Sequence, residues 1–318
     1  MAQATDVEPR SLVDGFWEHG RFYGSWRARK YLIPIDEEEL TRLDVFHKVF
    51  LVAQKDALFV APLHMDEKHP LRILDLGTGT GIWSFNVAET AEVQPEIMSV
   101  DLHQIQPARY VAFGSLQSKN KGLIERRIPP GVCTLQFDIE DTSWEPLLKE
   151  CDLVYLRTLY GSIHNHAWPD IYRNSFEHLR PGHGYIEHLE IDWVPRWEGN
   201  IPPKSALNEW SRLFLQGLDR FDRNARTDVG EVRKAFDKAG FVDFKEETIR
   251  CCVSPWTSDR HERDLARWFN FGFCNGIEAM SLMPMIEGLQ MTKEEVQELC
   301  GRVKSEICHL KNHAFVTL

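Results

Sequence analysis

Short apolar runs alternate with helical patterns from residue 71 onward. Such alternation is typical of βαβ units, in which helices cover both faces of a parallel sheet. The apolar runs predict five strands, over residues 71–76, 96–101, 133–138, 152–157 and 184–193. Apolar residues at helical spacing predict helices over 82–92 and 168–179. The predicted fold class is therefore α/β.

Two stretches lie outside this alternation. Residues 36–58 carry apolar side chains on one helical face, and we expect this helix to pack across the sheet or the ligand cleft. Residues 255–311 are predominantly helical and stand between a strand near 241–252 and a final strand near 313–318. The chain is thus divided into an N-terminal helical segment covering the cleft (1–66), a core (67–254), a helical cap (255–311) and a last core strand (312–318).

The cap contains the richest aromatic run in the chain, formed by Trp268, Phe269, Phe271 and Phe273. Aromatic residues at near-helical spacing usually pack into a core. A lid that lines a substrate pocket is the alternative, and the sequence leaves both open.

Composition excludes several classes of protein. The net charge of −11 would repel phosphate backbones and anionic membranes, so we expect neither nucleic acid nor membrane as a partner. No run of about eighteen apolar residues occurs, and residues 1–9 lack an apolar leader, which predicts a soluble, unsecreted protein. None of the seven cysteines forms a C-x-x-C pair, which favours reduced thiols in the cytoplasm. Without H-E-x-x-H spacing, we also expect no metal.

A glycine-rich turn follows the first predicted strand, in the order Gly77, Thr78, Gly79, Thr80, Gly81. Glycines allow a ligand to approach the backbone closely, and a predicted helix begins directly afterwards. Dinucleotide enzymes use G-x-G-x-x-G, whereas the spacing here is G-x-G-x-G. Asp75 also precedes the turn, where its charge would repel a pyrophosphate but attract an ammonium and a sulfonium. The turn therefore favours S-adenosylmethionine over NAD.

Two further acids end the next two predicted strands. Asp101 lies about 20 residues after Gly81, the spacing of the carboxylate that binds ribose hydroxyls in Rossmann units. Asp138 ends the third strand, where it could accept a hydrogen bond from the adenine amino group. Each alone could be an aspartate that caps a loop. In this order, the three acids predict a cleft at the carboxyl ends of the strands.

The sequence resembles the class I methyltransferases and, among them, the LaeA-like fungal methyltransferases. The matching residues extend over nearly the whole chain: Gly20-Arg21-Phe22-Tyr23, Lys30-Tyr31-Leu32-Ile33-Pro34, Asp36-Glu37, Arg42-Leu43-Asp44 with His47, residues 73–83, Val100-Asp101-Leu102, Ile105-Gln106-Pro107, Pro129-Pro130-Gly131, Phe137-Asp138-Ile139, Arg157, Gly161-Ser162-Ile163, Trp168 and Leu179-Arg180-Pro181-Gly182. The resemblance implies a Rossmann-like class I methyltransferase sheet with N-terminal helices and a helical cap inserted before the last strand.

The resemblance also implies which residues bind the cofactor, S-adenosylmethionine, and that residues 23–31 fold over it. The candidates are Tyr31, Asp75, Gly77, Thr78, Gly79, Gly81, Asp101, Leu102, Asp138, Ile139 and Arg157, the last through the backbone around it. Arg157 could instead simply pair with an acid.

The substrate end departs from the family pattern, because His164-Asn165-His166-Ala167 stands before Trp168. Methyl transfer to a hydroxyl benefits from a base, and a histidine can accept that proton near neutral pH. We expect His164 first, and His166 second, to act as the base. On the fifth strand, His188 with Glu187 or Glu190 are the reserve candidates, and strand alternation places only one parity in the cleft.

The sequence thus predicts an enzyme that methylates a small-molecule acceptor, with O-methylation of a fungal secondary metabolite such as an alkaloid as the leading hypothesis. The alternative is a LaeA-like regulatory methyltransferase that works through protein partners. An aromatic-lined cavity would favour the first hypothesis and an open groove the second. Whether the chain pairs with a second copy of itself stays open.

Overall fold

The computed structural model describes residues 13–63, 70–106, 109–112 and 124–318. A parallel five-stranded sheet has the order β7-β4-β3-β8-β9. Its strands are β3 (Arg72–Leu76), β4 (Glu96–Asp101), β7 (Val132–Gln136), β8 (Leu153–Arg157) and β9 (Tyr185–Leu189). The chain proceeds from β3 to β4 and β7 on one side, and to β8 and β9 on the other. Ligands bind in α/β sheets where the order reverses, which is here between β3 and β8.

Apolar side chains cover both faces of this sheet. In β3, Ile73 packs with Trp83 of α2 (Ile82–Thr90), whereas Leu74 belongs to the cluster that contains Ile171 of α3 (Trp168–His178). Tyr155 of β8 stacks on Trp83, with ring centroids 3.7 Å apart. Helix α5 (Val229–Ala239) packs against α3. The predicted parallel α/β sheet is therefore confirmed, because its strands are buried on both sides.

The predicted strand over residues 184–193 is in fact two strands. After β9 the chain breaks at residues 190–191 and continues as β10 (Asp192–Trp197). A three-stranded antiparallel sheet has the order β10-β12-β11, with β11 at Arg250–Cys252 and β12 at Ala314–Thr317. The final strand thus pairs with β10 and β11, and the strand expected near 241–252 is confined to its last residues. The break occurs where Glu190 turns its carboxylate onto the backbone of the loop after β8.

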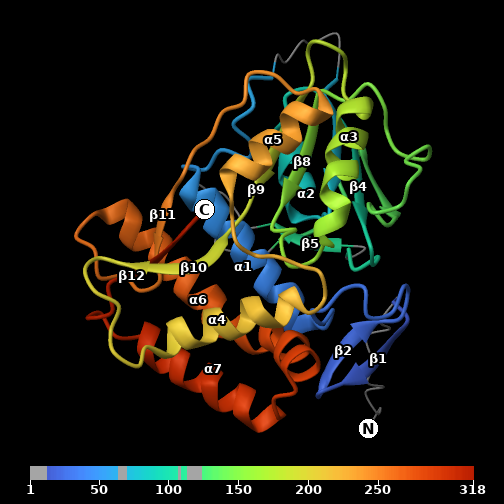
Figure 1. Cartoon of the computed structure of the whole chain (residues 1–318). Helices are drawn as coiled ribbons and strands as arrows, with labels where there is room; N and C mark the ends of the chain where they lie inside the picture. Colours follow the sequence, from blue (N-terminus) through green and yellow to red (C-terminus); the bar gives the residue numbers. More distant parts are fainter. Residues whose placement is uncertain (1–12, 64–69, 107–108, 113–123) are drawn as a thin grey trace, which may run out of the picture.

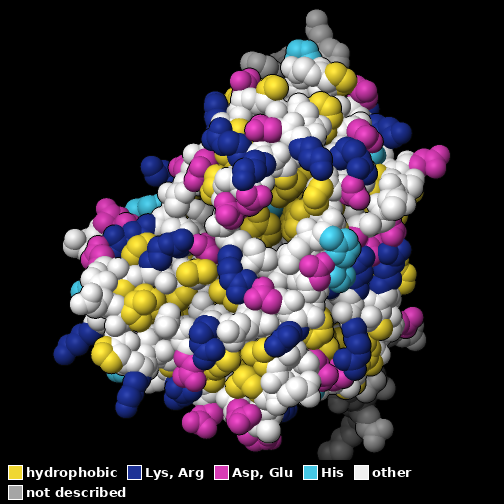
Figure 2. Space-filling model, in the orientation of Figure 1, with side chains coloured by type: hydrophobic (Ala, Val, Ile, Leu, Met, Phe, Trp, Pro, Cys, Tyr) yellow, Lys and Arg dark blue, Asp and Glu magenta, His cyan; other side chains and the backbone are white. Residues whose placement is uncertain are grey.

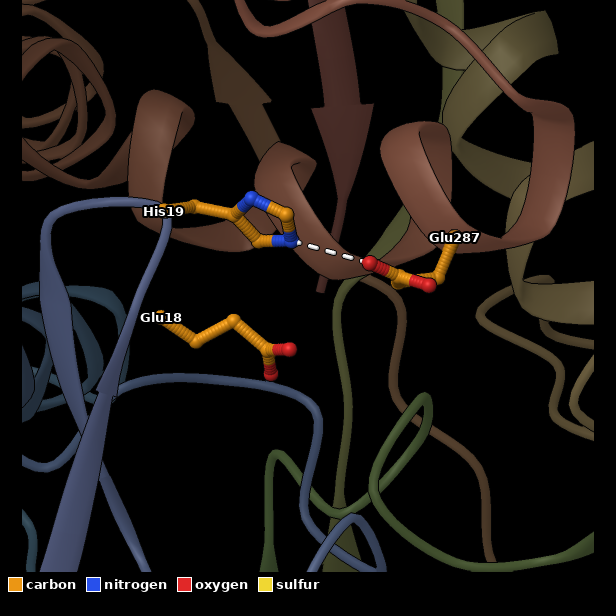
Figure 3. Close-up of side chains that lie close together, drawn as sticks. All are labelled: Glu18, His19 and Glu287. Carbon is orange, nitrogen blue, oxygen red and sulfur yellow. Dashed lines mark hydrogen bonds and ion pairs between the residues drawn. The ribbon is translucent and has the colours of Figure 1, made fainter.

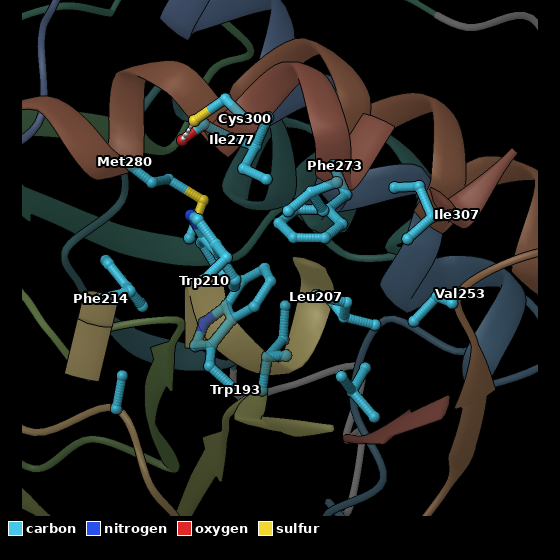
Figure 4. Close-up of a cluster of buried hydrophobic side chains, with 14 of the residues drawn as sticks. Trp193, Leu207, Trp210, Phe214, Val253, Phe273, Ile277, Met280, Cys300 and Ile307 are labelled. Carbon is cyan, nitrogen blue, oxygen red and sulfur yellow. Dashed lines mark hydrogen bonds between the residues drawn. The ribbon is translucent and has the colours of Figure 1, made fainter. Parts of the chain in front are cut away.

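A second core lies beneath the parallel sheet (Figure 1). It is built by α1 (Glu37–Ala53), α4 (Ala206–Asp219), α6 (Arg260–Leu282), the π-helix Met283–Glu287 and α7 (Lys293–Ile307). Trp193, Trp210 and Phe273 meet at its centre (Figure 4). Phe269 and Phe273 are buried, whereas Phe271 is 54% exposed, so the aromatic run of the cap packs mainly into this core.

The segment before α1 corrects an expectation, because residues 15–24 form a hairpin and not a helix. Its strands are β1 (Gly15–Glu18) and β2 (Arg21–Gly24). The two turn residues, His19 and Gly20, have φ angles of 52° and 82°. Positive φ at both positions gives the twist that a two-residue hairpin requires. Cross-strand aromatic pairs such as Phe16–Tyr23 further stabilise the pairing.

The remaining elements are short or peripheral. A second hairpin is formed by β5 (Arg109–Ala112) and β6 (Ile124–Arg127), and a 3₁₀ turn covers Asn165–Ala167. Within the described ranges, no helix is both long and apolar enough to cross a bilayer. Figure 2 shows acidic and basic side chains interspersed on the visible face.

A tight contact between α4 and the π-helix leads to a stability prediction. A Cβ atom at Gly217 would lie 2.3 Å from the carbonyl oxygen of Pro284. Gly217→Ala should therefore lower the free energy of unfolding by about 1–3 kcal/mol, because the clash outweighs the gain in helix propensity. Urea denaturation measures this change. The neighbouring exposed Gln216→Ala is the control, and equal stability of the two variants would contradict the prediction.

Candidate active site

The glycine turn lies at the carboxyl end of β3, in the conformation that its sequence requires. Gly77, Gly79 and Gly81 have φ angles of 69°, 60° and 80°, which residues with a Cβ rarely adopt. The backbone amides of Gly77 and Thr78 donate to the carbonyl of Val100 in β4, at 2.9 and 3.0 Å. A Cβ at Gly77 would also lie 2.3 Å from Leu159. The turn is thus held against β4 and against the loop after β8.

Asp75 holds the turn from within the sheet. Its carboxylate accepts hydrogen bonds from the hydroxyls of Thr78 and Ser84, at 2.5 and 2.7 Å. Burial raises the pKa of this carboxyl, and the two hydroxyls oppose that rise. The structure therefore shows the carboxylate engaged with the turn and with the first residues of α2. Its direct contact with the ammonium or sulfonium of a cofactor stays a prediction.

Asp101 ends β4 beside the turn, as the sequence predicted. One carboxylate oxygen accepts from the amide of Gly79 at 2.8 Å, and the other from the amide of His103 at 3.1 Å. Each oxygen has a second lone pair, so both can still accept a hydroxyl. Burial raises the pKa of Asp101 to about 6. The backbone carbonyl of Leu102, next to it, accepts from the side-chain amide of Gln136 at 3.1 Å.

The third acid, Asp138, is covered by the N-terminal segment. Its carboxylate accepts hydrogen bonds from the side chains of Arg27 and Lys30 and from the backbone amide of Glu140. Arg223, which is distant in the sequence, donates a hydrogen bond to the backbone carbonyl of Lys30. Arg27 and Lys30 thus fasten the N-terminal segment to Asp138, and the folding of residues 23–31 over the cofactor stays a prediction. The adenine contact of Asp138 stays a prediction, and so does the one of Ile139, whose carbonyl accepts from Trp144 at 3.1 Å.

The buried His47 connects α1 to the end of β8, and the sequence predicted no role for it beyond a match to the family. Nδ1 of His47 lies 3.1 Å from the guanidinium of Arg157, and Nε2 lies 2.7 Å from the amide group of Asn86. Since arginine only donates, Nδ1 must accept, and the ring is neutral. Burial first, and then Arg157 and Lys48, lower the pKa of His47 well below its usual value. Within the part of the chain that the structure describes, Arg157 thus contacts a histidine and forms no ion pair with an acid.

A small cavity of about 50 Å³ adjoins the glycine turn. Leu43 lines it and would be 3.5 Å from a Cβ at Gly79, so the turn and the cavity share a wall. Its other lining residues come from the N-terminal segment, α1, α4, α6 and the end of β8, and include Tyr31, Arg42, Phe46, Thr158, Tyr160, Glu190, Trp193, Phe214 and Met280. Thr158 has a φ of 53°, an unusual conformation for a β-branched residue. Strain of this kind often marks functional sites.

Glu190 is the carboxylate of this cavity. Its Oε1 accepts from the amides of Leu159 and Tyr160, at 2.7 and 3.0 Å, and lies 2.8 Å from Nε2 of His188. Nδ1 of His188 in turn lies 3.1 Å from the hydroxyl of Tyr172. Burial raises the pKa of Tyr172, which keeps this hydroxyl protonated and able to donate. The chain Tyr172–His188–Glu190 therefore orients the carboxylate.

The two histidines expected to act as bases lie elsewhere. Nδ1 of His164 is 2.8 Å from Glu140, and Nδ1 of His166 is 2.5 Å from Asp222. The side chain of His166 is 73% exposed. Neither histidine is among the residues that line the cavity. Of the reserve candidates, Glu190 lines the cavity, whereas Glu187 accepts from the backbone amides of residues 60–61 and does not line it.

Comparison with known families defines the class. The family described as "Methyltransferase domain" matches residues 45–246, which is more than half of the chain. That range contains the glycine turn, Asp101, Asp138 and Glu190. The protein is therefore a methyltransferase of class I, with S-adenosylmethionine as its cofactor.

Relatives narrow the class to one family. The chain is 50% identical over 314 residues to the secondary metabolism regulator LAE1 of Hypocrea atroviridis, covering 98% of this chain and 84% of that protein. It is likewise 50% identical to the secondary metabolism regulator laeA of Fusarium oxysporum f. sp. lycopersici, covering 98% and 93%. The chain belongs to the LaeA-like family.

Among solved structures, the cyclopropane synthase MmaA2 from Mycobacterium tuberculosis is similar at 14% identity and a TM-score of 0.42, over 86% of this chain and 81% of that one. A likeness this distant says nothing about the acceptor.

The residues at the sheet edge fit the cofactor. The free lone pairs of Asp101 suit the two hydroxyls of a ribose, and the turn at Gly79 presents backbone without a side chain. Gln106 donates to the carbonyl of Gly79 at 2.7 Å and supports the turn from the same side.

The raised pKa of Asp101 predicts how cofactor binding depends on pH. Ribose hydroxyls donate to the carboxylate form, so affinity should be full above the pKa of about 6 and decline as the pH falls through it. Between about pH 7.5 and about pH 5, the Kd for S-adenosylhomocysteine should rise about tenfold, one power of ten per pH unit below the pKa. Calorimetric titration measures this rise.

Asp101→Asn is the matched control for this titration. The variant should bind weakly at both pH values and lose most of the pH dependence, because its amide does not titrate in this range. If the Kd for S-adenosylhomocysteine of the unaltered protein did not change with pH, the assignment of Asp101 as the carboxylate that binds the ribose would be contradicted.

Proposed function

We propose that this protein is a methyltransferase that regulates secondary metabolism through protein partners. The similarity to regulators of secondary metabolism carries this proposal, because it reaches 50% identity over 98% of the chain. A match over 98% of the chain extends over the cap and the N-terminal segment as well as the cofactor edge.

The chain's own residues would have three tasks in methyl transfer. The glycine turn and Asp101 would hold S-adenosylmethionine, which supplies an electrophilic methyl group on its sulfonium. Arg27 and Lys30, paired with Asp138, would keep the N-terminal segment over the cleft and exclude water from it. Leu43 lines the cavity and lies beside the turn, so it would help to place the acceptor in line with the methyl group of the donor.

A second candidate function is O-methylation of a small molecule, and the aromatic side chains that line the cavity favour it. Its walls include Phe46, Trp193 and Phe214 together with polar side chains such as Thr158 and Glu190. Ligand sites for small molecules combine apolar walls with polar groups, and this cavity of about 50 Å³ would have to widen to admit an acceptor. In this case the carboxylate of Glu190 would accept the proton of the acceptor hydroxyl while His188 fixes its orientation.

Labelling distinguishes the two functions. The protein is incubated with radiolabelled S-adenosylmethionine and, separately, with the protein fraction and the small-molecule extract of a fungus that lacks its own LaeA-like gene. Label is expected in a protein fraction. Label that appears only in the extract would overturn the regulatory proposal in favour of the second candidate, and the inactive Asp101→Asn variant sets the background in both.

The identity of the base is tested in the same assay. Glu190→Gln should lower turnover about 10²–10⁴-fold, the usual contribution of a general base, and should leave the Kd for S-adenosylhomocysteine unchanged. His164→Ala tests the base expected from the sequence and, because His164 does not line the cavity, should have a smaller effect. A large loss in His164→Ala together with normal turnover in Glu190→Gln would return the role to His164.

A further inference from the structure

Three side chains with metal-binding atoms meet where the hairpin turn touches the cap. Glu18 ends β1, His19 is the first turn residue, and Glu287 ends the π-helix. One ligand atom from each lies within 4.8 Å of the other two. Figure 3 shows the ring of His19 directed at Glu287, with the carboxylate of Glu18 reaching into the same space. We propose that these residues bind a divalent zinc ion that fastens the N-terminal hairpin to the cap.

An unpartnered oxygen supports this site. Oε1 of Glu18 accepts from Arg29 at 2.6 Å, but Oε2 is buried and has no hydrogen-bond partner among the described residues. A buried carboxylate oxygen without a donor is unfavourable, and a bound cation is one of the ordinary explanations for it. The side chains of Glu18 and His19 are only 20% and 18% exposed, so bulk water satisfies them poorly. A cation bound between them would provide the missing partner.

The donor set selects the metal. One imidazole nitrogen and two carboxylate oxygens suit zinc, which binds such ligands at about 2.0–2.2 Å and completes its tetrahedron with water. In a tetrahedron with these bond lengths two ligand atoms lie about 3.4 Å apart, so the three side chains, now within 4.8 Å of one another, would have to close by about 1 Å. Magnesium prefers oxygen ligands alone and retains its water, so it should bind much more weakly.

The cluster is held together in the structure by a hydrogen bond and an ion pair. Nε2 of His19 lies 3.1 Å from Glu287, and Glu18 pairs with Arg29. The ammonium of Lys293 also lies beside the turn, 3.0 Å from where a Cβ at Gly20 would stand. Zinc would therefore replace the hydrogen bond between His19 and Glu287 and would bind near a lysine ammonium. Glu18 and His19 reach Glu287 because residues 15–24 form a hairpin, whereas the sequence predicted a helical N-terminal segment.

Calorimetric titration of the full chain with zinc chloride tests the proposal. The buffer contains no chelator, and a phosphine keeps the cysteines reduced. One zinc ion per chain should bind, and His19→Ala and Glu287→Gln should each weaken binding at least about tenfold. Magnesium chloride should give no saturable binding at the same concentrations. Zinc should also slow backbone hydrogen exchange in residues 15–24, a change that does not depend on methyl transfer.

Two exposed residues near α7 provide matched controls. His309→Ala and Glu294→Gln remove the same ligand types outside the cluster and should bind zinc as the unaltered protein does. Exposed Cys133 and Cys308 could also bind zinc, but such binding would persist in His19→Ala and Glu287→Gln. Unchanged affinity in both cluster variants, or the absence of saturable zinc binding, would overturn the proposal.

Discussion

The hydrogen bonds of the buried Asp75 carboxylate are the constraint on which the cofactor edge depends. A charged group taken out of water must find donors, and here they are the hydroxyls of Thr78 in the turn and Ser84 in α2. The carboxylate thereby fixes the turn and the helix relative to β3. Only with the turn in this place does the amide of Gly79 reach Asp101. A residue expected to bind the ligand is thus equally a residue that builds the site.

The sequence predicted those features that depend on neighbouring residues. Apolar runs identified the parallel strands, and the glycine spacing identified the turn, because both reflect local backbone geometry. The hairpin at 15–24 was missed, although His19-Gly20 between aromatic residues is the kind of signal that could have found it. Its side chains show no long alternation, and four-residue strands give a weak pattern.

The contacts of the N-terminal segment and the residues of the acceptor end could not be predicted, because they depend on contacts between distant segments. Asp138 receives Arg27 and Lys30 from more than one hundred residues away. The parity of the fifth strand left Glu187 and Glu190 open, and only the packing of residues 60–61 on Glu187 separates them. Likewise, spacing along the chain gives no indication that Glu287 lies beside His19.

The break between β9 and β10 has a consequence for how the two cores respond to stress. One continuous stretch of chain supplies the edge strand of the parallel sheet and, two residues later, an edge of the antiparallel sheet. Local opening of either sheet removes hydrogen bonds from the same segment and releases Glu190 from the loop that it holds. The two cores are therefore mechanically coupled, and the cavity lies at the joint between them.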